Sequence, residues 1–231
     1  TFTIVVANTN DAPAVSSTAV TSATEDAAYS YSITTSDDDS DSSDSWTISC
    51  TTCPSWLSIS HTAGASTATL SGTPLNANVG DNSVVISVAD AASATGTQSF
   101  TIAVANANDA PTITSTAVTA ATEDTAYTYT VTTSDADSGD TVTLTGTTVP
   151  SWATFTASTG VLTGTPLDAN VGDNNVVITA SDGNGGSVTD TFTIVVANTN
   201  DAPAVSSTAV TSATEDAAYS YSITTSDDDS D

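Results

Sequence analysis

The sequence predicts an all-β protein built from tandem Greek-key β-sandwiches of about seven antiparallel strands each. Apolar and polar residues alternate in short runs, such as residues 175–181 and 191–197, which is the period-two pattern of half-buried strands. No long amphipathic helical period occurs in the 231 residues. The runs recur in units of about 95 residues, and seven strands without helices in a unit of that size are typical of a sandwich.

The elements are clearest in the second complete unit. The segments ADSGD, TVPS, STG and DGNGG contain the glycine, proline and aspartate residues of turns, and they separate the strand-like runs. From these runs we expect strands at residues 112–118, 126–133, 141–146, 152–156, 160–164, 175–181 and 187–197. Their larger side chains are the expected core, namely Tyr127, Tyr129, Trp152, Phe155, Leu162, Ile178, Phe192 and Ile194.

The chain repeats itself at two levels. Residues 1–41 recur letter for letter at residues 191–231, so the outer period is 190 residues. Within that period the tetrapeptide NDAP marks the start of each unit, at residues 10–13, 108–111 and 200–203. We expect the last strand of a preceding repeat at 1–9, complete repeats at 10–107 and 108–199, and the first part of a following repeat at 200–231. A subunit whose amino-terminal strand completes a neighbouring chain is the alternative interpretation.

The charge of the chain limits its partners. The sequence holds 27 acidic residues, one histidine and no lysine or arginine, for a formal net charge of −27. Such a polyanion has no side chain to pair with phosphate, which argues against nucleic acid and anionic membrane surfaces as partners. The sequence contains no apolar stretch of about 18 residues, the length needed to span a bilayer. Cations are the natural partners.

Cysteine and histidine give little support to catalysis or to a zinc site. Cys50 and Cys53 stand at a CxxC spacing, and zinc would need four nitrogen or sulfur ligands where only His61 remains to help. We expect a small structural disulfide in an oxidising environment, with free thiols as the alternative. His61 lies in an inserted loop of one unit and has no counterpart in the other, so we expect no enzymatic activity.

Aspartates gather after the second predicted strand of every unit. The segments are SDDDSDSSDSW from Ser36, SDADSGDTV from Ser134 and SDDDSD from Ser226. Two carboxylates about 5 Å apart at an effective dielectric constant near 20 repel each other by roughly 3 kcal/mol. Without lysine or arginine, a divalent cation is the available remedy, and Ca²⁺ prefers hard oxygen ligands of this kind. A solvated acidic turn is the alternative for any one segment.

The order of PSW, GTP, SDG and NDAP in both complete units resembles the cadherin-like repeats of the dystroglycan type and the related Ig-like repeats of bacterial surface proteins. The resemblance implies calcium at the junctions between repeats. The implied ligands at the junction between the complete repeats are Glu25, Asn108, Asp109, Asp135 and Asp137, with Asp182 as a further candidate. At the following junction they are Glu123, Asp168, Asn200, Asp201, Asp227 and Asp229, and at the preceding one Asn10, Asp11, Asp37 and Asp39.

This sequence departs from the cadherin pattern in its number of carboxylates. The position of the cadherin DxE motif holds Asn76 and Asn78 in the first unit and Asp168 and Asn170 in the second. Fewer carboxylates predict fewer ions, so we expect one calcium ion per junction.

These observations predict a structural segment of a long extracellular array, on a microbial cell surface, that serves as an adhesin shaft, stalk or fibre. Its partners would be the neighbouring repeats of the same chain and, in a bundle, identical chains. A self-associating filament subunit and a glycan-binding module are the alternatives. An exposed aromatic cluster would favour glycan binding, whereas the few aromatic residues here are expected in the core.

Overall fold

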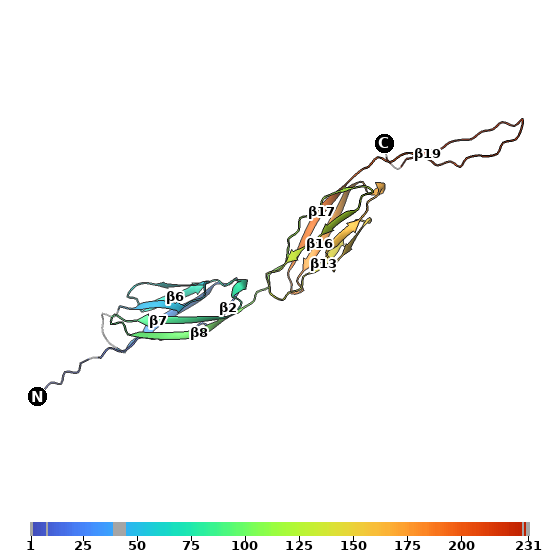
Figure 1. Ribbon diagram of the computed structural model, residues 1–231. Coiled ribbons are helices and arrows are strands. Elements are labelled where there is room, and N and C mark those ends of the chain that lie inside the picture. Colours follow the sequence, from blue (N-terminus) through green and yellow to red (C-terminus); the bar gives the residue numbers. More distant parts are fainter. Residues whose placement is uncertain (1, 8, 39–44, 228, 230–231) are drawn as a thin grey trace. The chain divides into compact units, whose positions relative to one another are not determined.

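A computed structural model describes residues 2–7, 9–38, 45–227 and 229 of the chain (Figure 1). Asp39, a predicted calcium ligand, lies outside the described residues. The chain forms two compact units, Thr1–Asn108 and Asp109–Asp231. Strands and loops account for almost all of both units, which confirms the predicted all-β class.

The first unit contains two four-stranded sheets, which Figure 1 shows in blue to green. One sheet has the order β1-β3-β6-β5 and the other the order β2-β8-β7-β4. Strands that are distant in sequence therefore lie side by side, as a Greek-key sandwich requires. The elements are β1 (Ala14–Val15), β2 (Ser22–Thr24), β3 (Tyr29–Ser36), β4 (Thr47–Thr52), β5 (Leu57–His61), β6 (Thr67–Gly72), the 3-10 helix η1 (Asn76–Asn78), β7 (Gly80–Ala89) and β8 (Thr95–Ala105).

The second unit repeats this architecture. Its larger sheet has the order β10-β17-β16-β13, and the other layer contains the sheet β11-β15-β14 and the pair β12-β9. A further pair, β18-β19, lies in the part of the chain that begins the next repeat. The elements are β9 (Thr112–Ile113), β10 (Ala120–Thr122), β11 (Tyr127–Thr130), β12 (Thr133–Ser134), β13 (Thr143–Thr148), β14 (Ala153–Thr156), β15 (Val161–Gly164), η2 (Asp168–Asn170), β16 (Gly172–Ser181), β17 (Ser187–Ala197), β18 (Ala204–Val205) and β19 (Thr225–Ser226).

The period-two pattern sets the core. Along β16 the side chains of Val176, Ile178 and Ala180 are fully buried, while the residues between them are more exposed, because successive side chains of a strand point to opposite faces. Tyr127, Tyr129, Leu162 and Ile194 join this core, and Trp152, Phe155 and Phe192 pack against it partly buried, so the predicted core is confirmed.

Two edge-to-face aromatic contacts pack against the core of the second unit. The rings of Tyr127 and Trp152 meet edge to face at 5.6 Å, and Tyr129 meets Phe192 in the same way. Trp152 also donates from Nε1 to Oδ1 of Asn174 at 2.9 Å. Its ring is therefore used inside the sandwich, as predicted. Burial raises the pKa of Tyr127 to about 12.

The first predicted strand of the second unit differs from the structure. Within the predicted range 112–118 only Thr112–Ile113 form a strand, β9, which pairs with β12 in one layer. The next strand, β10, lies beyond that range and pairs in parallel with β17 in the other layer. The phenol of Tyr127 donates to the carbonyl of Val118 at 2.6 Å and holds the crossing segment between the layers. The parallel pairing matters for function because it places the residue after β10 at the end of β17.

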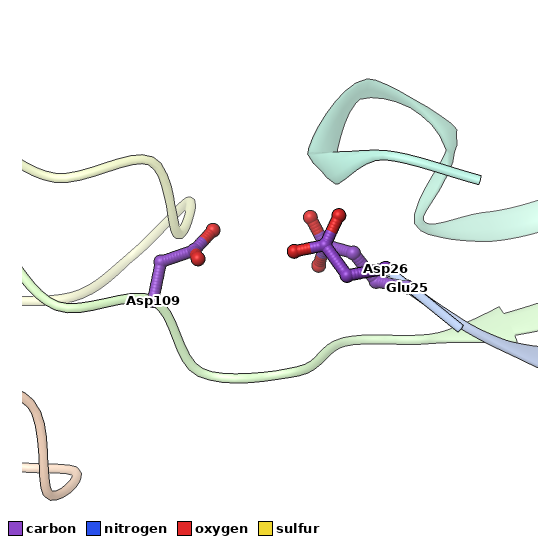
Figure 2. Close-up of side chains that lie close together, drawn as sticks. All are labelled: Glu25, Asp26 and Asp109. Carbon is purple, nitrogen blue, oxygen red and sulfur yellow. The ribbon is translucent and has the colours of Figure 1, made fainter. Parts of the chain in front are cut away.

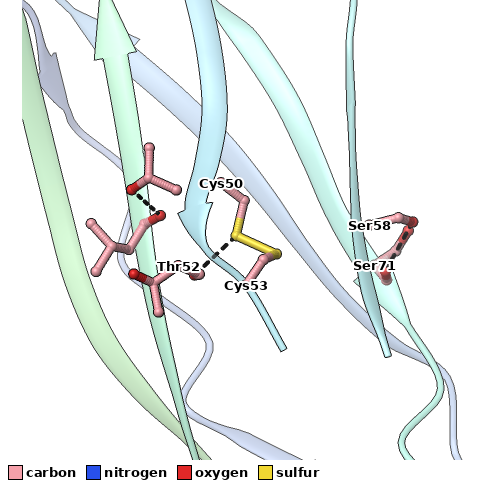
Figure 3. Close-up of a disulfide and its surroundings, with 7 residues drawn as sticks. Cys50, Thr52, Cys53, Ser58 and Ser71 are labelled. Carbon is pink, nitrogen blue, oxygen red and sulfur yellow. Dashed lines mark hydrogen bonds between the residues drawn. A yellow bond between two sulfur atoms is a disulfide. The ribbon is translucent and has the colours of Figure 1, made fainter. Parts of the chain in front are cut away.

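Cys50 and Cys53 form a disulfide at the end of β4 (Figure 3). The pairing of β4 with β7 shifts register between Cys50 and Thr52. The second unit has the same shift between Gly146 and Thr148, without cysteines. The disulfide therefore braces a β-bulge that the fold also forms without it.

Candidate cation sites at the ends of the repeats

Glu123 lies at the end of β10, where the parallel pairing with β17 fixes its backbone. Its amide donates to the carbonyl of Ala197 at 3.0 Å, and the next amide, that of Asp124, donates to the carbonyl of Pro166 at 2.9 Å. Asp124 has a φ of 57°, a left-handed conformation that aspartate tolerates better than most residues. This tight turn leaves the Glu123 side chain only 2% exposed.

Glu123 belongs to two groups of carboxylates. In the first group, one oxygen each of Glu123, Asp168 and Asp229 lie within 4.8 Å of one another. In the second, the same holds for Glu123, Asp124 and Asp201. The members come from separate segments: the turn after β10, the short helix η2, the linker after β17 and the turn after β19. The fold thus brings five acidic side chains together around Glu123, although some of them are about one repeat apart in the sequence.

The electrostatics of this place favour the neutral form of Glu123. Burial raises the pKa of its carboxyl group, and the nearby charges of Asp168, Asp124 and Asp201 raise it further. The amide of Thr199, which donates to Oε2 at 3.4 Å, offsets only part of this effect. No lysine or arginine exists in the chain to supply a compensating charge. A bound cation would supply that charge and favour the ionised form of Glu123.

Asp229 is oriented for this site by the polar groups of the linker. Its Oδ1 accepts from Nδ2 of Asn198 at 3.0 Å, and its Oδ2 accepts from the amide of Asp201. The Asp229 amide in turn donates to Oδ1 of Asp227 at 3.1 Å, so Asp227 shapes the turn. Asn200 donates from Nδ2 to the carbonyl of Asp201.

A third group, Asp135, Asp137 and Asp140, lies in the loop between β12 and β13 and also has one oxygen each within 4.8 Å. Asp135 and Asp137 repeat the turn of Asp227 and Asp229, because the Asp137 amide donates to Oδ1 of Asp135 at 3.0 Å. Oδ2 of Asp137 accepts from the amide of Asp109 at 2.7 Å. Within the described part of the chain, Oδ2 of Asp135 and Oδ1 of Asp137 are buried without a hydrogen-bond partner.

The carboxylate of Asp182, a further predicted ligand, accepts hydrogen bonds from backbone amides. Its Oδ1 accepts from the amides of Asn184, Gly185 and Gly186 at 2.7 to 3.0 Å, and its Oδ2 also accepts from Gly186. Backbone amides thus occupy this carboxylate and close the loop between β16 and β17. Asp182 belongs to none of the carboxylate groups found among the described residues.

The first unit has counterparts of these residues. Glu25 is also 2% exposed, and Figure 2 shows it beside Asp26 in the turn after β2. The amide of Ala107 donates to Oε2 of Glu25 at 3.4 Å, as Thr199 does to Glu123. At the other end of the unit, Asn10 donates from Nδ2 to Oδ2 of Asp90 at 2.9 Å. This bond, together with backbone amides, lowers the pKa of Asp90.

Sequence reasoning missed several residues of these clusters. Asp26 and Asp124 follow the predicted glutamates directly, and the triplet TED occurs in all three units, which was an available signal. Asp140 lies in the acidic segment SDADSGDTV that the sequence analysis identified, but it was not among the predicted ligands. Among the described residues, the carboxylate groups do not include the predicted Asp11, Asp37 and Asp227.

The donor set of these places fits a hard divalent cation. The side-chain ligand atoms of the clustered residues are carboxylate and amide oxygens, which calcium and magnesium prefer. Among the residues that the structure describes, two buried carboxylate oxygens of these clusters accept no hydrogen bond. Calcium takes six to eight oxygen ligands in flexible geometry, so backbone carbonyls and water can complete its shell. Asp135, Asp137 and Asp140, and Glu123 with its neighbours, are the residues that would hold such an ion.

The architecture and the repeated ends define a tandem array of Ig-type β-sandwich domains. The chain belongs to the family described as Putative Ig domain, whose model matches residues 12–105 and 110–197. A search of the curated proteins finds no match. In the described part of the chain, the helices are too short and polar to cross a membrane.

Solved structures with similar folds include cadherin ectodomains. The protocadherin gammaB4 extracellular domain has a TM-score of 0.53 and 18% identity, and the match covers 95% of this chain and 40% of that one. The protocadherin gammaB7 EC3-6 cis-dimer structure has the same TM-score and 16% identity, covering 95% and 62%. An endo-fucoidan hydrolase of glycoside hydrolase family 107 matches with 28% identity, a TM-score of 0.39 and coverage of 81% and 29%. The chain thus spans less than two thirds of each matched protein, and the protocadherins support the cadherin-like fold.

Proposed function

We propose that this chain is a segment of a long extracellular array, an adhesin shaft, stalk or fibre, in which calcium stiffens the junctions between successive repeats. The role is structural and not enzymatic. The observation that carries the proposal is the buried Glu123, which is surrounded by acidic side chains in a chain without lysine or arginine. The sites lie at the ends of repeats and draw on linker residues, which is where an ion can restrict the linker.

Calcium would act here as a structural lock. Without it, the carboxylates around each glutamate repel one another, and the repeats can lower this repulsion by moving apart. With it, ligands from the turn after the second strand, the short 3-10 helix and the linker share one ion. Extracellular modules with such ligand sets typically bind calcium with dissociation constants on the order of 10⁻⁴ to 10⁻³ M. Array stiffness would therefore depend on the calcium level outside a cell.

Small-angle X-ray scattering of the 231-residue chain tests this proposal. In millimolar calcium we expect a narrower distribution of interdomain distances than in chelator, and magnesium should have a smaller effect because it dehydrates reluctantly. Glu25→Gln should abolish most of the calcium response. Glu215→Gln is the matched control, because Glu215 stands in the same TED motif but is exposed in the partial repeat. Scattering that is identical with calcium and with chelator would refute the proposal.

A further inference from the structure

The loop between β12 and β13 holds a cluster of carboxylates that come entirely from the second repeat. Asp135, Asp137 and Asp140 stand within six positions of one another and meet with one oxygen each within 4.8 Å. Their closeness thus depends on the shape of a single loop and needs no residue of the preceding repeat.

Two oxygen atoms of these aspartates are available to a ligand. Oδ2 of Asp135 and Oδ1 of Asp137 are buried, and neither has a hydrogen-bond partner in the described part of the chain. Asp137 is only 5% exposed. Leaving an ionised oxygen buried and unpaired is costly, and a cation would satisfy both atoms together.

The loop is shaped to add Asp140 as a third ligand. Gly139 has a φ of 105°, which residues with a Cβ rarely adopt, and the amide of Asp140 donates back to the carbonyl of Asp137 at 3.4 Å. Nδ2 of Asn184 then donates to Oδ2 of Asp140 at 2.8 Å. The amides that Asp182 holds place Asn184 in this position. The first repeat has no glycine in its corresponding acidic segment and no counterpart of the DGNGG loop.

We infer that Asp135, Asp137 and Asp140 form a divalent-cation site that is complete within the second repeat, with Asn184 as a positioning residue. The choice of calcium as the ion rests on the proposed function, whereas the site itself does not depend on a junction. Oδ2 of Asp137 accepts from the Asp109 amide, so an ion held by Asp137 would also fix the first residue of this unit. The repeat would thus bind this ion before a neighbouring repeat contributes any ligand.

Calorimetric titration of calcium into the whole chain tests the site. Asp140→Asn should weaken one class of sites at least tenfold, and Asn184→Ala should weaken the same class several-fold while keeping all carboxylates. Asp173→Asn is the matched control, because Asp173 is exposed on β16 and lies outside every carboxylate group of the described residues. Melting in chelator checks folding: Asp140→Asn should unfold no earlier than the parent, because one repelling charge is removed.

Identical isotherms for Asp140→Asn and Asp173→Asn would overturn the inference. The proposed function fails by a different result, namely scattering that does not respond to calcium. If calorimetry shows that Asp140→Asn has lost one ion, but the scattering of the parent does not respond to calcium, the site within the repeat is supported and stiffening at junctions is refuted. Responsive scattering with an unchanged isotherm would support the junctions and refute this site.

Discussion

At the scale of single residues, buried acids without basic partners dominate the chemistry of this chain. Glu25 and Glu123 are each 2% exposed, yet neither has a lysine or arginine to pair with. A backbone hydrogen bond next to the parallel strand pairing fixes the main chain of each glutamate. The fold therefore positions the backbone of both glutamates, and nearby carboxylates repel their charged forms when no cation is bound.

Glu123→Gln should reverse its effect on stability when calcium is added. Burial and neighbouring carboxylates raise the pKa of Glu123 in the folded chain, so the folded state favours the neutral form. The contribution of the neutral Glu123 to folding stability is fully present below the pKa that this group has in the unfolded chain. It is lost as the pH rises through the pKa of Glu123 in the folded chain. In chelator at neutral pH, the uncharged glutamine should therefore melt no earlier than the parent. In calcium it should melt earlier, because a ligand is lost.

Differential scanning calorimetry in both conditions measures this reversal, with Glu215→Gln as the exposed control. The difference between Glu123→Gln and the parent in chelator should also shrink as pH falls below the folded pKa of Glu123, where the parent side chain is protonated too. A variant that melts well below the parent in chelator would contradict the account, since it would mean that the ionised glutamate stabilises the empty site.

At the scale of elements, the sequence predicted what depends on local periodicity. The sandwich, its repeated strands and core residues such as Tyr127 and Ile178 follow from alternation and turn chemistry. The sequence did not predict that β9 and β10 are separate strands in different layers, or that β10 pairs in parallel with β17. Both features depend on contacts between distant segments. The carboxylate groups share this limit: Glu123, Asp168 and Asp229 are recognisable as acids, but only the completed topology brings them together.

The disulfide of the first unit provides a prediction at the element scale. Cys50 and Cys53 brace a bulge that the second unit forms without cysteines, so reduction should preserve the fold. Closing so short a loop contributes about 2 kcal/mol at most by the chain-entropy estimate. We expect reduction, or Cys50→Ser with Cys53→Ser, to lower the melting temperature of the first unit by several degrees and leave the second unchanged.

Calorimetry in calcium, with and without a reducing agent, resolves this effect, and the second unit serves as the internal control. Loss of the far-ultraviolet strand signal on reduction would show that the bulge needs its disulfide. An equal shift of both units would show that the reducing agent acts elsewhere.

At the scale of the whole molecule, a net charge of −27 raises the question of whether calcium acts at sites or only as a screening ion. Long-range repulsion between carboxylates is screened by any salt, with a Debye length of about 3 Å at 1 M ionic strength. Buried groups such as Asp137 and Glu123 are screened much less, since salt ions do not reach them. The two effects should therefore separate experimentally.

Thermal melting separates screening from binding at sites. The melting temperature is measured in chelator over a range of sodium chloride concentrations, and again at each concentration after addition of millimolar calcium. Sodium chloride alone should raise the melting temperature gradually in the parent, in Glu123→Gln and in Asp140→Asn, because it relieves surface repulsion in all three. Calcium should add a further rise at high salt in the parent and a smaller one in each variant, which lacks one ligand. If concentrated sodium chloride reproduced the whole calcium effect, the acidic clusters would be a screened surface charge and the buried carboxylates would need another explanation.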